Sequence, residues 1–378
     1  MKIVADDKIP FLKGVLEPYA EVHYLPGKAI TREVLLDTDA LLIRTRTKCT
    51  EALLNGSAVK FIGTATIGFD HIDTHYCEKN KIVWTNAPGC NSSSVRQYIA
   101  SGLLKIASEN GFSLKGKSIG IVGVGNVGSK VEKFARTMGM TVLLNDPPRA
   151  RAEGKDKFVN MNTLLSESDI VTVHVPLIMT GEDFTYHLFT EKILKKMKKG
   201  TWFINSSRGE VADTNSLIKF LDSGKPGGAV LDVWEKEPDI DRELLARVRL
   251  ATPHIAGYST DGKANGTSMV VNALADFFGL PVKDWYPANV PPPEDPVISI
   301  DCKGKNDEEI ISDAVSVTYD IGLDDRNLRL SPSGFEKQRG EYRLRREFTA
   351  YTVDLKSGNK KSEKMLEALG FRILSKHK

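Results

Sequence analysis

Short apolar runs alternate with polar, helix-compatible segments along the first 95 residues. The five runs lie at 2–5, 21–24, 40–43, 60–63 and 82–84. Their length and bounding polar residues are typical of buried strands. Intervening segments, such as 31–36 and 51–54, can supply the helical crossovers. Strands that alternate with helical crossovers predict a small doubly wound parallel sheet.

A second alternation follows a long helix predicted over residues 92–110. Its strand candidates lie at 118–122, 141–145, 170–174, 201–205, 228–232 and 249–251. Six such strands with helical links fit one complete dinucleotide-binding sheet. The pattern therefore predicts an α/β protein with two doubly wound parallel sheets.

The pattern changes again after residue 251. An apolar-patterned helix is expected over 262–279, and a proline-rich stretch at 287–293 is a plausible domain boundary. The elements predicted beyond it are runs at 297–301, 348–354 and 371–374, an amphipathic run over 307–319 and a helix near 360–369. Together they suggest a small α+β module. A module of this size without a chemical motif most often has a role in assembly.

The glycine run Gly123-Val-Gly-Asn-Val-Gly128 joins the first strand of the second sheet to a helix-like segment. In a dinucleotide-binding turn, Gly123 allows the tight turn, and Gly125 lets the backbone approach a pyrophosphate. Gly128 lets the helix pack on the strand. Asn126 and Val127 complete the turn, and the free N–H groups of the helix N-terminus would meet the pyrophosphate.

Asp146 closes the next apolar run, about 20 residues further on. A carboxylate at this place accepts hydrogen bonds from both ribose hydroxyls of an adenosine. It also disfavours a 2′-phosphate, so we expect NAD rather than NADP as the cofactor.

Composition narrows the class of protein. The chain has 378 residues, 41% hydrophobic and 27% charged, with a net charge of +3. This near balance argues against nucleic acid as a partner. The four cysteines match no metal spacing, so we expect reduced thiols, no metal and a cytoplasmic protein. The sequence shows no signal peptide and no apolar run that could span a bilayer, so no membrane partner is expected.

Three polar residues follow predicted strands of the second sheet: Arg208, Glu237 and His254. Ligands of a parallel sheet bind beyond the carboxyl ends of its strands, so all three could face one cleft. Their types suit oxidation of a 2-hydroxy acid. His254 can take the hydroxyl proton, Glu237 can favour the imidazolium, and Arg208 can hold the substrate carboxylate.

Each of these residues also has an ordinary structural interpretation. Arg208 could be a surface residue at a helix start, Glu237 a solvated loop acid, and His254 a satisfied loop histidine. The coincidence of three such strand ends after one cofactor motif favours the catalytic interpretation.

Four blocks carry a resemblance to a known family: 123–128, 204–209, 231–238 and 252–257. They resemble the D-2-hydroxyacid dehydrogenases, and the likeness covers essentially the whole chain. The resemblance implies a flavodoxin-like substrate domain (1–95 and 255–285), a Rossmann NAD domain (96–254) and a C-terminal dimerisation domain (286–378). It also implies a homodimer whose substrate is a phosphorylated 2-hydroxy acid.

The resemblance assigns Arg208, Glu237 and His254 as the catalytic residues. Besides the glycine turn and Asp146, it places Val175, Ser206, Ser207, Arg208, Asp232 and Gly257 along the cofactor. Thr45, Thr66 and Tyr258 would contact the substrate. The chain departs from the family at Gln97, where a glutamate is usual.

A substrate phosphate would need cations. Arg44, with Arg346 from the C-terminal module, is our candidate pair, although Arg44 could equally be surface charge at a strand end. The basic segment Lys337, Arg339, Arg343, Arg345 and Arg346 is interpreted mainly as a solvated or interface helix face. Two alternative functions stay open. One is the same chemistry on another D-2-hydroxy acid such as 3-phosphoglycerate, and the other is an NAD-sensing, corepressor-like binding protein.

Overall fold

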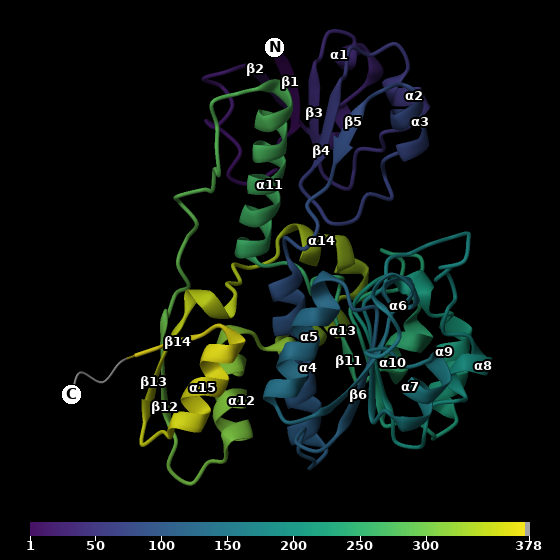
Figure 1. Ribbon diagram of the computed structural model, residues 1–378, viewed down its shortest axis with the longest axis vertical. Helices are drawn as coiled ribbons and strands as arrows, with labels where there is room; N and C mark the ends of the chain where they lie inside the picture. Colours follow the sequence, from purple (N-terminus) through teal and green to yellow (C-terminus); the bar gives the residue numbers. More distant parts are fainter. Residues whose placement is uncertain (375–378) are drawn as a thin grey trace. The chain divides into compact units, whose positions relative to one another are not determined.

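The computed structural model describes residues 1–374 (Figure 1). They divide into two compact units. The first contains Met1–Asn91 and Ser259–Pro291, and the second contains Ser92–Tyr258 and the segment that begins at Pro292. None of the helices in these described residues is long and apolar enough to cross a membrane.

The first unit is a five-stranded parallel sheet in the order β2-β1-β3-β4-β5. Its strands are β1 (Lys2–Asp6), β2 (Glu21–Leu25), β3 (Ala40–Ile43), β4 (Phe61–Thr64) and β5 (Val83–Thr85). Its helices are η1 (Gly27–Ala29), α1 (Arg32–Leu35), α2 (Glu51–Leu54), α3 (Thr74–Lys79) and α11 (Thr260–Phe278). The doubly wound sheet predicted for the first 95 residues is confirmed.

Alternate residues of the central strands face two separate apolar cores. Ile3 packs in a core with Val270 and Leu274 of α11, whereas Val4 packs in a core with Leu35 and Leu54 from the short helices. Burial on both faces explains why the strands read as continuous apolar runs. Helix α11 is thus part of this unit although it follows the second sheet in sequence (Figure 1).

The second unit contains a six-stranded parallel sheet in the order β11-β10-β9-β8-β6-β7. Its strands are β6 (Ser118–Val122), β7 (Thr141–Asn145), β8 (Ile170–Val173), β9 (Trp202–Asn205), β10 (Gly228–Leu231) and β11 (Leu250–Ala251). Its helices are α4 (Ser92–Glu109), α5 (Asn126–Thr137), α6 (Pro147–Glu153), α7 (Met161–Glu167), α8 (Glu191–Leu194), η2 (Gly209–Val211), α9 (Thr214–Asp222) and α10 (Arg242–Arg247). The predicted Rossmann sheet is confirmed.

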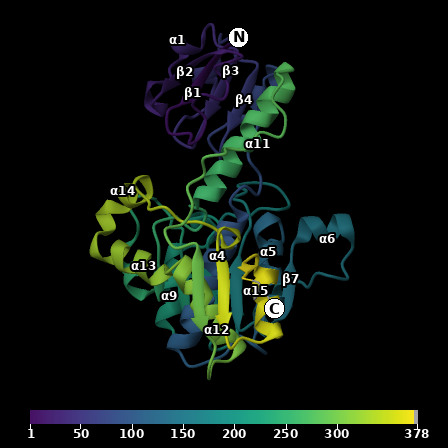
Figure 2. The same cartoon turned by 90° about the vertical axis from the view of Figure 1, so that its left-hand side faces the viewer.

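The C-terminal segment adds a small parallel sheet in the order β12-β13-β14. Its strands are β12 (Val297–Asp301), β13 (Thr352–Lys356) and β14 (Arg372–Ile373). Its helices are α12 (Asp307–Thr318), α13 (Ile321–Leu330), η3 (Pro332–Gly334), α14 (Phe335–Gly340), η4 (Phe348–Ala350) and α15 (Lys360–Leu369). Figure 2 shows α12 and α15 beside this sheet, and both helices contact it.

The C-terminal segment shares one core with the dinucleotide-binding sheet. Apolar residues of α12 and β13 belong to the same buried cluster as Tyr98 of α4 and Phe134 of α5. Gln97 of α4 is fully buried and donates a hydrogen bond to the carbonyl oxygen of Arg346 at 2.9 Å. The neutral amide at this position therefore tethers α4 to the C-terminal segment.

Candidate active site

The backbone geometry of the turn between β6 and α5 explains why glycine stands at three of its positions. Gly123 has φ +87°, and a Cβ there would lie 2.6 Å from the carbonyl oxygen of His174. A Cβ on Gly128 would lie 2.1 Å from the carbonyl oxygen of Gly123, which shows how tightly helix and strand pack. A Cβ on Gly125 would meet nothing within 4 Å. Gly125 therefore leaves open space before the N-terminus of α5, where an anion can approach the free N–H groups.

Asp146 follows β7, the strand paired with β6, and lies against the glycine turn. Its Oδ2 accepts a hydrogen bond from the N–H of Val124 at 2.8 Å. Its Oδ1 accepts from the N–H of Arg149 at 3.1 Å and so caps α6. Our sequence interpretation missed this capping role, although an aspartate before Pro147 is a typical start of a helix.

The residues Arg208, Glu237 and His254 follow β9, β10 and β11, which are neighbouring parallel strands. They therefore extend from the same edge of the sheet. A Cβ on Gly209 would lie 2.0 Å from the carbonyl carbon of Trp234. The loop that carries Arg208 thus lies directly against the loop that leads to Glu237.

His254 and Glu237 form a hydrogen-bonded pair. Nδ1 of His254 lies 2.7 Å from Oε2 of Glu237, and Oε1 of Glu237 accepts from the N–H of Trp234 at 3.0 Å. Burial raises the pKa of Glu237, but the charge and hydrogen bond of His254, the Trp234 N–H and the charge of Arg339 together lower it below its usual value. Glu237 is therefore a carboxylate at neutral pH.

His254 itself has a left-handed backbone, with φ +54°. A histidine in this conformation is uncommon and must be held by its surroundings. The N–H of His254 donates to the carbonyl oxygen of Asp232 at 2.7 Å. The Asp232 carboxylate accepts from the N–H groups of Ile255 and Ala256, both at 2.8 Å. Asp232 therefore fixes the turn that presents the imidazole.

Asp232 is 1% exposed and also accepts from the hydroxyl of Thr252 at 2.6 Å. Burial raises its pKa, against the lowering effects of the charge of His254 and of these hydrogen bonds. The family resemblance implied a place for Asp232 along the cofactor, and sequence reasoning missed its bonds to the turn.

The remaining expected cofactor residues lie near the same edge of the sheet. Val175 comes within 2.9 Å of the Cβ position of Gly123. Oγ of Ser206 is buried and has no hydrogen-bond partner among the described residues, so it can still bond to a ligand. Oγ of Ser207 instead donates to Oδ1 of Asn205 at 2.9 Å. Gly257 lies just after the turn that Asp232 holds.

The expected substrate residues are distributed over both units. Arg44, Thr45 and Thr66 belong to the first unit, whereas Tyr258 and Arg346 belong to the second. Nη1 of Arg44 donates to the carbonyl oxygen of Lys8 at 3.2 Å.

The basic segment 337–346 is not one helix face, so that interpretation is wrong. Helix α14 ends at Gly340, and the chain from Arg343 to Arg346 has no helical structure. Arg345 is only 2% exposed and donates a hydrogen bond to the carbonyl oxygen of Ala256. Its guanidinium carbon lies 4.5 Å from the ring centroid of Tyr319. Packing against aromatic rings, which no local pattern reveals, holds this arginine inside the protein.

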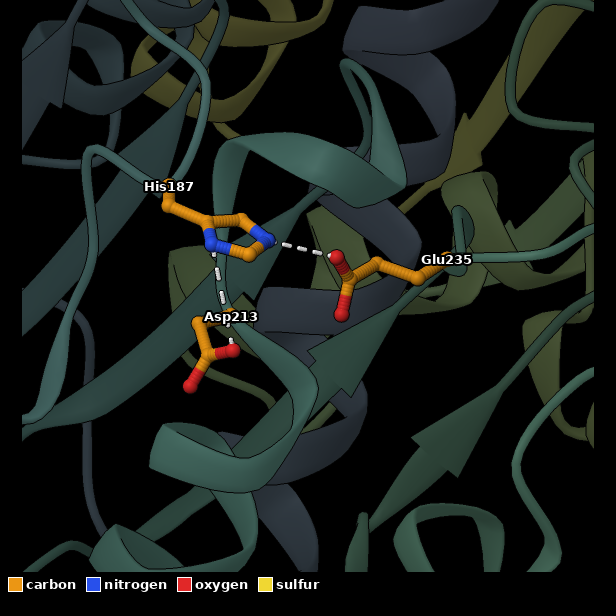
Figure 3. A group of neighbouring side chains, drawn as sticks. All are labelled: His187, Asp213 and Glu235. Atoms are coloured by element: carbon orange, nitrogen blue, oxygen red, sulfur yellow. Dashed lines mark hydrogen bonds and ion pairs between the residues drawn. The ribbon is translucent and has the colours of Figure 1, made fainter.

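A second polar cluster supports the loop before Glu237 (Figure 3). Nε2 of His187 lies 2.6 Å from Oε1 of Glu235, and its Nδ1 lies 3.9 Å from Oδ1 of Asp213. Each carboxylate uses its other oxygen to bond a backbone N–H at the start of α9. These three residues are the sole group among residues 1–374 with metal-ligand proximity. The short hydrogen bond between His187 and Glu235 already uses the ring nitrogen and the carboxylate oxygen that a metal ion would need.

Comparisons with known proteins agree with this arrangement. Residues 92–256 match the model of the D-isomer specific 2-hydroxyacid dehydrogenase NAD binding domain, and residues 292–370 match a domain of unknown function. Erythronate-4-phosphate dehydrogenase of Bacteroides fragilis is 49% identical over 93% of this chain and 99% of its own length. The protein of the same name from Proteus mirabilis is 42% identical over the full length of both chains.

A solved structure agrees as well. D-lactate dehydrogenase from Aquifex aeolicus, complexed with NAD and lactic acid, matches with a TM-score of 0.62 and 26% identity. The match covers 78% of this chain and 100% of that one. The predictions of an oxidoreductase and of NAD as its cofactor are confirmed. The chain belongs to the D-isomer-specific 2-hydroxyacid dehydrogenases, and within them to the family of the erythronate-4-phosphate dehydrogenases.

Proposed function

We propose that the protein oxidises 4-phospho-D-erythronate to (R)-3-hydroxy-2-oxo-4-phosphooxybutanoate with NAD, a step of pyridoxal 5′-phosphate biosynthesis. The observation that carries the chemistry is the 2.7 Å contact between His254 and Glu237 at the strand ends. The substrate follows from the shared name of relatives up to 49% identical.

The pair suits removal of the C2 hydroxyl proton. Nδ1 of His254 faces Glu237, which leaves Nε2 to take the proton from the hydroxyl oxygen. As the O–H bond breaks, the C2–H bond breaks with its electron pair and C2 becomes a carbonyl carbon. Bound NAD supplies the acceptor for that hydride. The Glu237 carboxylate stabilises the imidazolium that forms, and Arg208 holds the substrate carboxylate and polarises the C2 oxygen.

The residues around the glycine turn fit a dinucleotide. The open space at Gly125, the start of α5 and the Asp146 carboxylate suit a pyrophosphate and an adenosine ribose. The buried hydroxyl of Ser206 is a free hydrogen-bonding group for the nicotinamide half. We assign Asn126, Val127, Val175, Ser207, Arg208, Asp232 and Gly257 to the same cofactor.

Thr45, Thr66 and Tyr258 are proposed substrate contacts, with Arg44 and Arg346 as candidate phosphate ligands. We further propose a cytoplasmic homodimer assembled through the C-terminal segment. Its helices support this assignment because they present exposed apolar side chains: Val317 is 57% exposed, Leu323 38% and Leu330 84%.

The test is an NADH-formation assay on the purified protein with 4-phospho-D-erythronate and 3-phosphoglycerate side by side. A high enzyme concentration makes a single turnover visible if NADH leaves slowly. We expect kcat/KM to favour the erythronate by about 10-fold or more, since a single methylene group in an apolar pocket already gives about 10- to 200-fold discrimination and the two acids differ by a whole CHOH unit. Equal or better use of 3-phosphoglycerate would reassign the substrate. NAD binding without turnover of either compound would favour the corepressor-like role.

A further inference from the structure

Arg339 brings a positive charge from the C-terminal segment to the His254–Glu237 pair. It lies on α14, and its guanidinium carbon is 5.7 Å from the ring centroid of Tyr258, four residues after His254. The same group is 5.8 Å from the ring of Phe335. Its charge is close enough to contribute to the lowered pKa of Glu237. All these residues belong to the second unit of one chain.

One buried donor of Arg339 has no acceptor among the described residues. Nη1 donates to Oε1 of Glu336 at 2.9 Å, but Nε is buried and has no acceptor within the described part of the chain. A guanidinium has five N–H donors, and a buried donor without an acceptor is costly. An arginine that packs near two aromatic rings and has a buried donor without an acceptor can bind an anionic ligand.

Two other arginines of the segment differ from Arg339 in their surroundings. Arg343 pairs with Asp324, next to the ring of Tyr342. Arg345 also has buried donors without an acceptor among the described residues, but it is only 2% exposed, donates to the carbonyl oxygen of Ala256 and packs against the rings of Tyr319 and Tyr342. Lys337, on the same helix as Arg339, is exposed. Arg339 is therefore the basic residue of α14 that packs against Tyr258, an expected substrate contact.

We propose that Arg339 binds the substrate phosphate, so that the C-terminal segment supplies a substrate ligand to the active site of its own chain. The inference rests on the proposed function. A four-carbon acid with a phosphate on C4 carries negative charge at both ends, and Arg208 is assigned to the carboxylate. Arg339 then provides a cation for the phosphate near Tyr258, in addition to the candidate ligands Arg44 and Arg346.

The experiment compares the wild-type protein with Arg339→Gln, Arg339→Lys and the matched control Lys337→Gln. Lys337→Gln removes the same charge from the same helix at an exposed position. For each protein, kcat and KM are measured with 4-phospho-D-erythronate and with D-erythronate. If D-erythronate reacts too slowly, its inhibition constant replaces its KM. Inorganic phosphate is tested as a competitive inhibitor, and NADH binding reports whether each variant is folded.

For Arg339→Gln we expect KM for the phosphorylated substrate to rise about 30-fold, the size typical of losing a charged hydrogen bond. The preference for the phosphorylated over the unphosphorylated acid falls by a similar factor, and inhibition by inorganic phosphate weakens. Arg339→Lys recovers part of the loss, while Lys337→Gln behaves as wild type.

An equal loss for both acids, or an unchanged KM for 4-phospho-D-erythronate, overturns the assignment. A wild-type protein that does not oxidise 4-phospho-D-erythronate at all would instead overturn the proposed function. If Arg339→Gln does not bind NADH and is therefore misfolded, the Arg339→Lys variant tests the phosphate assignment instead. A lysine retains a charge but not the planar fork, so it must shift KM more for the phosphorylated acid than for the unphosphorylated one.

Discussion

His254 and Glu237 lie 17 residues apart in sequence, yet Nδ1 of the imidazole is 2.7 Å from Oε2 of the carboxylate. They meet because β10 and β11 are neighbouring parallel strands, so the segments that follow them leave the sheet at one edge. The contact fixes the orientation of the ring and leaves the opposite nitrogen, Nε2, outside this hydrogen bond.

Glu237→Gln is expected to lower kcat by about 10²-fold or more, since a neutral amide stabilises the imidazolium poorly. It should also alter how stability depends on pH. The pKa of Glu237 in the folded protein is below its usual 4.5, so the ionised group stabilises the fold above about pH 4.5. That contribution is lost as the pH falls through the lowered pKa.

Urea unfolding at pH 7 and near pH 3 measures this effect. The variant should be less stable than wild type by about 1–3 kcal/mol at pH 7, with the difference shrinking in acid. Glu243→Gln, on a side chain that is 63% exposed, is the control and should change little. A difference that grows in acid would contradict the assignment of Glu237 as a stabilising carboxylate.

His254→Ala should reduce kcat by about 10³-fold, because the proton acceptor is removed. NADH affinity should stay nearly unchanged, since the glycine turn and Asp146 are the proposed contacts of the other end of the cofactor. Stopped-flow turnover and fluorescence titration with NADH separate the two effects. Loss of cofactor binding would show that His254 is a structural residue of the turn.

Asp232→Asn should destabilise the protein by about 2–3 kcal/mol and reduce kcat. The carboxylate accepts two backbone N–H groups and one hydroxyl, and an amide would turn one acceptor into a donor facing them. Urea unfolding checks this loss against Asp239→Asn, an exposed residue in the loop after β10. If both variants lose little stability while only NADH binding falls, Asp232 acts on the cofactor rather than on the turn.

Chelator treatment should leave activity and Tm unchanged, and added Zn²⁺ should not raise Tm. The cluster of His187, Asp213 and Glu235 is held by hydrogen bonds, and the 2.6 Å separation of Nε2 and Oε1 would have to open to admit an ion. His187→Ala should lower Tm by a few degrees, with or without chelator. Restoration of a chelator-lowered Tm by Zn²⁺ would show that the cluster is a metal site.

The sequence by itself determined the two parallel sheets, the glycine turn and the strand ends that carry Arg208, Glu237 and His254. These features depend on local pattern: short apolar runs form strands, and parallel strands bring their carboxyl ends together. Only the tertiary structure decided the part played by the C-terminal segment. The basic stretch 337–346 has no periodicity that separates the buried Arg345 from the exposed Lys337.

The tertiary structure also decided which groups Asp232 and Arg339 contact. The family resemblance implies a cofactor contact for Asp232, but the bonds of Asp232 to the 255–256 turn depend on how two loops fold over each other. Arg339 reaches Tyr258 across 81 residues of sequence because the C-terminal segment shares a core with the dinucleotide-binding sheet. Local patterns specify secondary structure, whereas long-range packing selects which charged side chains approach the active site.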